Sequence, residues 1–244
     1  MSAAAQKARL RAAIWERLER EGVAAFPRPI VGRIPNFRGA AAAAARLAAE
    51  PAFVAARTVK VNPDAPQLPL RLRALQAGKC VLVPTPRLRG GFFLLDPARI
   101  APAHWRAAAS IAGFARHGVP LTLDELPSID LMVLGAVAVA PDGARVGKGE
   151  GYAELEYAVL RTLGRLAATT LLCTTVHDIQ IVPAIPVEPF DVPVDIVATP
   201  TRVLHTHTPY PRPPGVLWEY LAPERLAAMP VLAELRARQG EAGG

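Results

Sequence analysis

Apolar residues recur at helical spacing in several stretches of the chain. Near the N-terminus, Leu10, Ile14, Trp15 and Leu18 fall on one side of a helical projection, which predicts an amphipathic helix over residues 3–21. We expect this helix to lie across the rest of the molecule as a lid or flank. The same reasoning predicts further helices at 39–50, 68–76, 102–117, 152–166 and 224–238.

Short, nearly uninterrupted apolar runs lie between these helices and predict strands. The run at 131–139 is so continuously apolar that we expect a central strand covered on both faces. Other strands are expected at 58–61, 79–83, 91–95, 169–176 and 196–199. Strands that alternate with helices favour βαβ units. The sequence therefore predicts one α/β domain over 1–238, a three-layer α/β/α fold with a mostly parallel central sheet, and a flexible tail at 239–244.

A glycine-rich stretch connects the expected central strand to the helix at 152–166. It contains Gly147, Gly149 and Gly151, together with the bases Arg145 and Lys148. A basic glycine loop between a strand and a helix is a typical anion site, because backbone N–H groups and the helix dipole favour negative charge there. The pattern thus predicts a phosphate loop. The spacing is not G-x-G-x-x-G and the loop follows a late strand, so a dinucleotide-binding oxidoreductase is disfavoured.

Composition narrows the class of protein. The chain has 244 residues, of which 51% are hydrophobic, so it is long enough and apolar enough for a full core. The sequence contains no run of 18 apolar residues, so a membrane-spanning helix is not expected. It also lacks an apolar segment before a cleavage site near the N-terminus, so secretion is not indicated. Cys80 and Cys173 lie in apolar runs without a C-x-x-C neighbour. We expect them to be buried thiols in a reducing, cytoplasmic environment.

The formal net charge of +7 suits either a nucleic-acid partner or a polyanionic small molecule. The excess is arginine dispersed along helices, aromatic residues are 6%, and no RNA-recognition or zinc-finger pattern is present. Nucleic acid is therefore the weaker alternative, and no membrane partner is expected. Lys7 and Arg11 project from one face of the first helix because they are four residues apart. That face is either solvated or binds an anion.

Three other patterns leave alternatives open. His177 and Asp178 follow a buried strand, where α/β sheets place ligands, so they form either an acid/base pair or a strand-end turn. His205 and His207 alternate on an extended segment, but a metal site would need a third ligand that the sequence does not identify. No G-x-S-x-G elbow is present, which disfavours a serine hydrolase.

Four blocks in fixed order resemble one family. They are Lys7-x-x-x-Arg11, the strand at 78–84, the glycine block at 143–152, and the proline-rich block at 185–195. Together they resemble the 5-formyltetrahydrofolate cyclo-ligase (methenyltetrahydrofolate synthetase) family. The glycine block alone is a modest signal, but the four blocks in this order are specific.

The resemblance implies closure of 5-formyltetrahydrofolate to 5,10-methenyltetrahydrofolate with ATP and Mg²⁺ as cofactors. In that chemistry the formyl oxygen attacks the γ-phosphorus of ATP, the second folate nitrogen attacks the phosphorylated imine, and phosphate leaves. Such phosphoryl transfer needs bases, a metal and N–H groups around the γ-phosphate. The implied partners are a small-molecule folate and ATP; the oligomeric state is open.

The resemblance also assigns roles to residues of this chain. It implies catalytic roles for Arg145 and Lys148, and Mg²⁺ binding by Glu154 and Asp191; one or two carboxylates suffice for Mg²⁺, which keeps several waters. Substrate binding is implied for Asp64 and Tyr152. Nucleotide binding is implied for Lys7, Arg11, Arg145, Gly147, Lys148, Gly149, Gly151 and Tyr152.

The chain also departs from the family pattern. The usual loop ends Gly-Gly-Gly-Tyr-Tyr-Asp, whereas this chain has Glu150, Ala153 and Glu154 in the variable positions, and Phe190 replaces the usual His of the proline-rich block. Glu150 repels phosphate unless it pairs with Lys148 or binds metal. These changes look more like the divergent methenyltetrahydrofolate-synthetase-domain-containing branch. We therefore expect a cyclo-ligase, with a non-catalytic paralogue that binds nucleotide or folate as the alternative.

Overall fold

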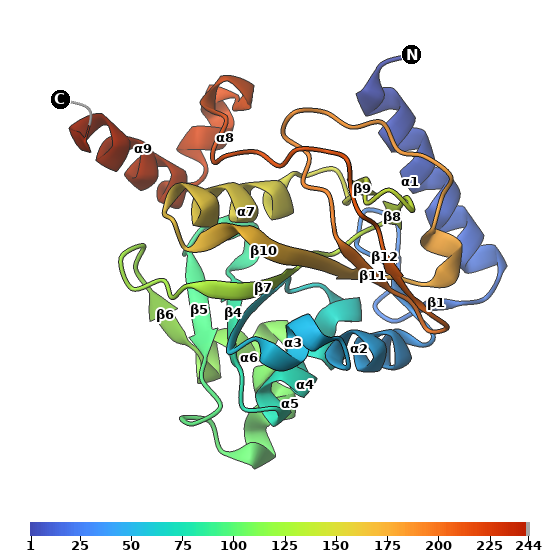
Figure 1. Ribbon diagram of the computed structural model, residues 1–244, viewed down its shortest axis with the longest axis horizontal. Coiled ribbons are helices and arrows are strands. Elements are labelled where there is room, and N and C mark those ends of the chain that lie inside the picture. The colour runs from blue at the N-terminus through green and yellow to red at the C-terminus, as the bar shows by residue number, and fades with distance from the viewer. Residues whose placement is uncertain (243–244) are drawn as a thin grey trace.

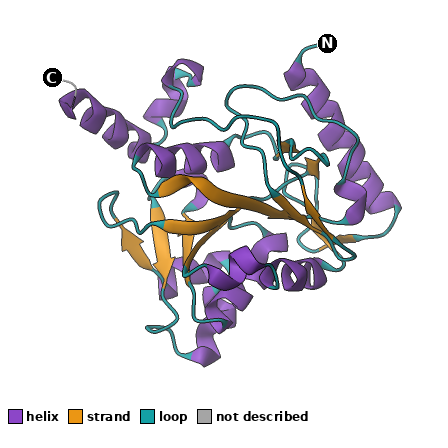
Figure 2. Ribbon diagram, viewed as in Figure 1, coloured by secondary structure: helices purple, strands orange, loops and turns teal. Residues whose placement is uncertain are grey.

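The computed structural model describes residues 1–242 and is built around a long, twisted sheet (Figures 1 and 2). Its strands and those of two small hairpins are β1 Ala24–Ala25, β2 Asn36–Phe37, β3 Thr58–Val61, β4 Cys80–Pro84, β5 Phe92–Leu95, β6 Val119–Leu121, β7 Ile129–Val133, β8 Ala138–Val139, β9 Arg145–Val146, β10 Leu166–Thr175, β11 Ile196–Ala198 and β12 Val203–His205.

The main sheet has 8 strands in the order β12-β11-β10-β7-β3-β4-β5-β6. The central strands from β11 to β4 run parallel to their neighbours. At the two ends, β5, β6 and β12 are added antiparallel. The predicted class is confirmed: the sheet is mixed, mostly parallel, and flanked by helices. Parallel strands need crossover connections, and the chain supplies helices for them.

Helices cover both faces of this sheet. In Figure 1, α7 lies over one face, and α2 to α6 lie over the other. The helices are α1 Ala3–Arg20, α2 Ala40–Ala48, α3 Pro51–Ala55, α4 Leu68–Gln76, α5 Trp105–Ala108, α6 Ile111–His117, α7 Tyr152–Thr162, α8 Pro223–Ala227 and α9 Pro230–Ala242. Short 3₁₀ helices occur at Ala65–Gln67, Pro86–Leu88, Pro102–His104, Asp178–Gln180 and Trp218–Tyr220.

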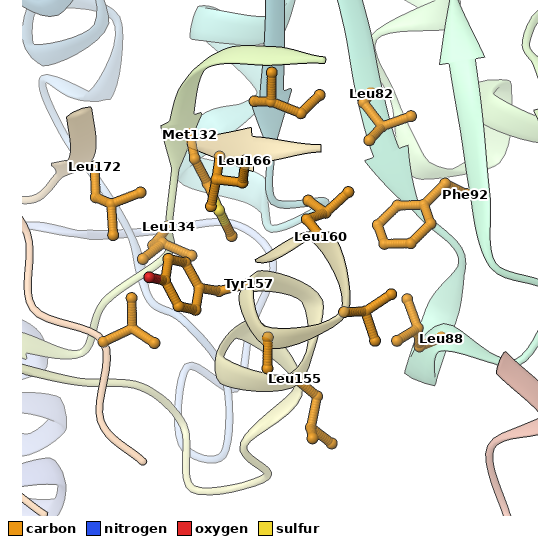
Figure 3. Packing of buried hydrophobic residues seen from close by; sticks show 14 of the residues in the cluster. Leu82, Leu88, Phe92, Met132, Leu134, Leu155, Tyr157, Leu160, Leu166 and Leu172 are labelled. Carbon is orange, nitrogen blue, oxygen red and sulfur yellow. The ribbon is translucent and has the colours of Figure 1, made fainter. Parts of the chain in front are cut away.

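Alternation along the central strands divides the core into two layers. In β7, Met132 joins the cluster under α7, whereas Leu131 and Val133 join the cluster on the opposite face. Tyr157 and Leu160 of α7 pack into the first cluster (Figure 3). Because successive strand residues point to opposite faces, a continuously apolar strand is what a sheet buried on both sides requires.

The first helix packs beside the sheet rather than on a face of it (Figure 1). Its buried residues Ile14 and Leu18 belong to a third cluster with Ala138, Val146 and Ile185. Val146 and Ala138 come from the β8–β9 hairpin, where they are paired antiparallel. The helix is therefore a flank that holds the hairpin, and this brings its basic face to the glycine loop that follows β9.

Several predicted boundaries differ from the structure. The apolar run at 131–139 is two separate strands, because the chain leaves the sheet after Val133 and forms the β8–β9 hairpin. The helix at 152–166 ends at Thr162, because Gly164 adopts a left-handed φ of 67°. Sequence periodicity did not reveal β6 or β12, since three-residue edge strands carry too few apolar positions.

Two other predicted helices are interrupted. The helix at 102–117 is a 3₁₀ turn, α5 and α6, with Ser110 accepting a hydrogen bond from the N–H of Gly113 at 3.1 Å to cap α6. The helix at 224–238 is α8 and α9, with Pro230 opening the second. Helix α9 continues to Ala242, into the segment predicted as a tail; residues 243–244 lie outside the described residues.

Within residues 1–242, no helix has the length and apolar character needed to cross a bilayer. Cys173 is buried and Cys80 is half-buried, and both are free thiols. Burial raises the pKa of each thiol, so neither is activated as a nucleophile. The prediction of buried thiols is confirmed for Cys173, whereas Cys80 is only half-buried.

Candidate functional site

A cavity of about 700 Å³ opens between the first helix, the glycine loop, the turn after β3 and the C-terminal segment, by which we mean residues 213–232. The residues to which the sequence assigned roles all line this cavity, although they come from segments far apart in the chain. They are Lys7, Arg11, Asp64, Arg145, Gly147, Lys148, Gly149, Gly151, Tyr152, Glu154 and Asp191. Their predicted roles in binding remain predictions; the structure brings them together.

Arginine guanidinium groups pack against the glycine loop and occupy the space that side chains at its glycine positions would fill. A Cβ atom on Gly147 would stand 3.3 Å from Nη1 of Arg145, and one on Gly149 would stand 3.3 Å from Cζ of Arg11. Gly149 has a φ of 103° and Gly151 a φ of 66°, in the region that favours glycine. Gly151 is also the N-cap residue of α7. The loop thus needs glycine for its backbone and for the approach of the arginines.

Arg145 holds the loop to the rest of the cavity. Its side chain is fully buried, with Nη1 donating to the carbonyl of Gly135 at 2.8 Å and Nε donating to that of Val192 at 3.4 Å. Nη2 donates to the carboxylate of Glu154 at the first turn of α7. All three nitrogens have protein acceptors, so Arg145 fixes the position of the loop; its contact with phosphate stays a prediction.

Lys7 and Arg11 reach the cavity from the first helix. Nζ of Lys7 lies 2.7 Å from a carboxylate oxygen of Glu188 and 2.5 Å from one of Asp191. Nε of Arg11 donates to the carbonyl of Gly147 at 2.7 Å. The pair is therefore part of the cavity wall, and the alternative of a solvated basic face does not apply to Lys7, which is buried.

Lys148 and Glu150 pair with each other across the loop. Nζ of Lys148 lies 2.6 Å from Oε2 of Glu150, and both side chains are partly exposed. Of the two partners that the sequence allowed for Glu150, a base or a metal, the structure provides the base. A phosphate at this loop would compete with Glu150 for Lys148.

The predicted metal ligands, Glu154 and Asp191, line the same cavity but are each paired with a base. In the described part of the chain, no group of three or more His, Cys, Asp and Glu side chains is arranged to hold a metal ion. Oxygen donors of this type suit Mg²⁺, which needs only one or two carboxylates beside phosphate oxygens and water. The residues therefore fit a Mg²⁺ that enters with a phosphate chain.

Asp64 lines the cavity from the turn after β3. A Cβ atom on Gly135 would stand 2.8 Å from Oδ2 of Asp64, so the carboxylate occupies the space that a side chain at 135 would fill. Burial raises the pKa of Asp64, and the charges of Lys148, Arg71 and Lys60 lower it in part. The carboxylate is held in the folded state at a cost to stability.

That cost gives a testable pH dependence. Because the folded-state pKa of Asp64 is raised, stability falls as pH rises from the pKa of the unfolded chain, about 3.9, through the folded value. We expect Asp64→Asn to raise Tm at pH 7, by about 2–4 °C for each kcal/mol relieved, and to lose this gain below about pH 4. Thermal unfolding from pH 3 to 8 measures it; a gain that is largest in acid would contradict the assignment.

A buried polar cluster between β3 and α7 contributes to the wall of the cavity, and sequence reasoning missed it. Lys60 of β3 is fully buried, its Nζ donates to Oδ1 of Asn62 at 2.6 Å, and it forms an ion pair with Glu156 of α7. Asn62 and Glu156 line the cavity. The available signals were a lysine inside a buried strand and a glutamate on the inward face of α7.

The C-terminal segment closes the remaining side of the cavity. Tyr220 packs edge-on against Phe190 with ring centroids 5.5 Å apart. The guanidinium of Arg225 in α8 lies 5.2 Å from the ring centroid of Tyr152. Tyr152, assigned to substrate or nucleotide, thus contacts an arginine that also lines the cavity and that the sequence analysis did not identify.

The histidines do not belong to this cavity. His177 caps a 3₁₀ helix, with Nδ1 accepting from the N–H of Ile179 at 3.3 Å. Oδ1 of Asp178 accepts from Thr199 Oγ1 at 2.7 Å. His205 lies 3.2 Å from Glu50. The strand-end turn, the alternative left open for His177 and Asp178, is the arrangement observed.

The chain is similar to known proteins over nearly its whole length. Residues 3–200 match the model of the 5-formyltetrahydrofolate cyclo-ligase family. The methenyltetrahydrofolate synthase domain-containing protein of Mus musculus is 45% identical over 241 residues, covering 97% of this chain and 65% of that protein. The protein of the same name from Bos taurus is 43% identical, covering 99% of this chain and 64% of that protein. The chain thus spans slightly less than two thirds of these relatives.

A solved structure shares the fold. The NMR structure of Aquifex aeolicus 5,10-methenyltetrahydrofolate synthetase aligns with a TM-score of 0.52 and 19% identity, covering 84% of this chain and 94% of that one. At this identity the likeness concerns the fold alone. The resemblance noted from the four sequence blocks, including the divergent branch, is confirmed by these matches.

Proposed function

The chain belongs to the 5-formyltetrahydrofolate cyclo-ligase family, and we propose that it closes 5-formyltetrahydrofolate, or a related formylated heterocycle, to the methenyl form with ATP and Mg²⁺. The observation that carries this proposal is the glycine loop at the opening of α7, lined by Arg11 and Arg145 within one cavity. Backbone N–H groups, a helix N-terminus and guanidinium groups are what a transferred phosphoryl group requires.

The reaction divides into steps that place defined demands on the protein. The formyl oxygen attacks the γ-phosphorus of ATP and ADP leaves; the second folate nitrogen then attacks the imidate carbon, loses its proton, and phosphate departs. The loop N–H groups at Gly149 and Gly151, with Arg11 and Lys148, would bind and orient the phosphates. Asp64 would hold the folate. Positioning of this kind supplies most of the catalysis in phosphoryl transfer.

Mg²⁺ bound with the nucleotide would neutralise charge on the phosphate oxygens. In this chain Glu154 and Asp191 would hold it through water or directly. Each carboxylate is already oriented by a base, Arg145 for Glu154 and Lys7 for Asp191. These pairs keep the carboxylates in place before the metal arrives.

One assay tests the proposal directly. Purified protein is incubated with 5-formyltetrahydrofolate, ATP and Mg²⁺, and formation of the methenyl chromophore is followed. We expect turnover that requires both ATP and Mg²⁺. Absence of product, under conditions in which a standard cyclo-ligase reacts readily, would contradict it.

The second candidate is a protein that binds nucleotide or folate without turnover. The Lys148–Glu150 pair favours it, because the glutamate neutralises a base at the glycine loop. ATP or folate that raises Tm without chromophore formation would support this candidate. An unchanged Tm with both ATP and folate would contradict this candidate.

The same pair gives a prediction about affinity. Lys148→Ala is expected to weaken ATP binding about tenfold, since a charge-assisted hydrogen bond is lost, while Tm changes little because the side chain is partly exposed. Glu150→Ala is the matched variant and should strengthen ATP binding, because it frees Lys148. Calorimetric titration measures both. Equal affinity in the two variants would remove Lys148 from the nucleotide site.

A further inference from the structure

Two of the cations at the glycine loop are already neutralised by the protein. Arg145 is paired with Glu154, and Lys148 with Glu150. Arg11 donates to a backbone carbonyl and has no ion pair among the described residues. Arg225 likewise has no carboxylate partner among the side chains that the structure describes. An incoming anion gains most from cations whose charge is not yet compensated.

Arg225 stands at the third glycine of the loop. A Cβ atom on Gly151 would lie 3.4 Å from Nη2 and 3.7 Å from Nη1 of Arg225. Gly151 is the N-cap residue of α7, an 11-residue helix, so the guanidinium lies beside the N-terminus of that helix. Arg225 also lines the cavity, and its Nε is buried without a hydrogen-bond partner. The group is thus placed at the anion site with unused donors.

Two contacts hold Arg225 in this position. Its guanidinium stacks over Tyr152, 5.2 Å from the ring centroid, which restricts a side chain that otherwise has many rotamers. The segment that carries it is anchored in the core under α7 by Val216, Met229 and Leu232. A pre-positioned guanidinium loses less freedom on binding than a mobile one.

The segment lies outside the part of the chain that matches the family. The match ends at residue 200, whereas Tyr220, Leu221 and Arg225 all line the cavity. The matched family model therefore does not include this wall, although similarity to the curated relatives extends over 97% of the chain. The segment completes the cavity and brings a cation to it.

We propose that Arg225 is a further phosphate-binding residue of this cavity, supplied by the C-terminal segment to the nucleotide at the glycine loop. Arg11, which lies beside Gly149, comes from the N-terminal helix, and Arg225 comes from the C-terminal segment. The two guanidinium groups would contact the phosphate chain together. The inference rests on the proposed ATP site. A folate glutamyl carboxylate offers similar oxyanion chemistry, but the glycine N–H groups and the α7 N-terminus at this position favour phosphate.

The test is calorimetric titration of wild type, Arg225→Ala and Arg225→Lys with ATP and with adenosine. Arg225→Ala is expected to bind ATP at least about tenfold more weakly and adenosine unchanged, because only the phosphate contact is lost. Arg225→Lys should be intermediate, since it keeps the charge without the planar fork. A point variant is used because truncation would remove core residues.

Arg236→Ala is the matched control. Arg236 also stacks on an aromatic ring of the C-terminal segment, 5.8 Å from the centroid of Trp218, but does not line the cavity. Its ATP affinity should equal that of the wild type, and Tm is compared for all variants. If wild type binds ATP and Arg225→Ala binds it equally well, the inference is wrong and the proposed function stands.

Two other outcomes would also overturn the inference. The same variants are also titrated with 5-formyltetrahydrofolate and with a pteroate that lacks the glutamyl group. If Arg225→Ala loses affinity for 5-formyltetrahydrofolate but not for ATP or the pteroate, Arg225 binds a carboxylate instead. Failure of the wild type to bind ATP would remove the nucleotide site itself, and with it both the proposed function and the role of Arg225.

Discussion

Lys60→Met is expected to lower the free energy of unfolding by about 3–5 kcal/mol, because it leaves Glu156 buried without its counter-charge. Lys60 is fully buried and Glu156 is 3% exposed, so Glu156 has little contact with solvent to compensate for the lost partner. Oδ1 of Asn62 also loses its donor. Urea unfolding measures the change as a shift of midpoint at constant slope.

The pH dependence identifies the cause. Burial raises the pKa of Glu156 and lowers that of Lys60, and in the variant the carboxyl has no cation to offset this. The deficit should therefore grow as pH rises above about 4.3, the ordinary pKa of glutamate, and shrink in acid where the carboxyl is neutral. A deficit independent of pH would mean that packing, not charge, is responsible.

Two variants serve as controls for this pair. Lys60→Met combined with Glu156→Leu should recover most of the lost stability, since a buried ion pair is often replaceable by apolar residues. Arg238→Ala removes a cation that pairs with Asp124 on the surface and should leave the midpoint almost unchanged. If Arg238→Ala were as destabilising as Lys60→Met, burial would not explain the effect.

Gly149→Val is expected to reduce turnover, where turnover is observed, by roughly 100-fold, because small displacements of positioning groups have effects of that size. The new Cβ would stand 3.3 Å from Cζ of Arg11, and the branched side chain would push the guanidinium from the loop. ATP affinity should fall together with turnover. Steady-state kinetics and calorimetric titration measure the two quantities.

Backbone strain must be separated from this effect. Gly149 has a φ of 103°, so valine there also destabilises the fold, by on the order of 1–3 kcal/mol. Gly78→Val is the matched control, because Gly78 has a φ of 73° and nothing within 4 Å of its added Cβ. We expect it to lose stability but to keep ATP affinity. Equal losses of affinity in both variants would attribute the effect to strain alone.

The sequence predicted the parts of the fold that depend on long, regular patterns. The strands around 58–61 and 79–83 and the helix at 68–76 lie where expected, because each has a clear period and a glycine or proline at its end. The apolar run at 131–139 was misjudged in extent. Burial alone cannot distinguish a strand from the irregular chain that leaves the sheet at Leu134 to Val137.

The site was predictable mostly where family blocks contain it or lie next to it. Lys7 and Asp191 belong to such blocks, and the structure places them in contact. Lys60 was passed over because a lysine in a strand reads as an exposed residue until its partner on α7 is known. Arg225 was passed over because it lies in a predicted helix outside the family blocks, and its contact with Tyr152 depends on tertiary structure.

The first helix has consequences for how the chain acquires its shape. Arg11 finds its carbonyl acceptor 136 residues later, and Lys7 finds Asp191 184 residues later. Contacts at such separations close large loops, and their entropy must be lost before the contacts form. The helix can therefore dock only after the β8–β9 hairpin and the proline-rich block have formed, both during synthesis and during refolding. We expect its docking to be among the last folding events, so that the proposed anion site forms only after the sheet is complete.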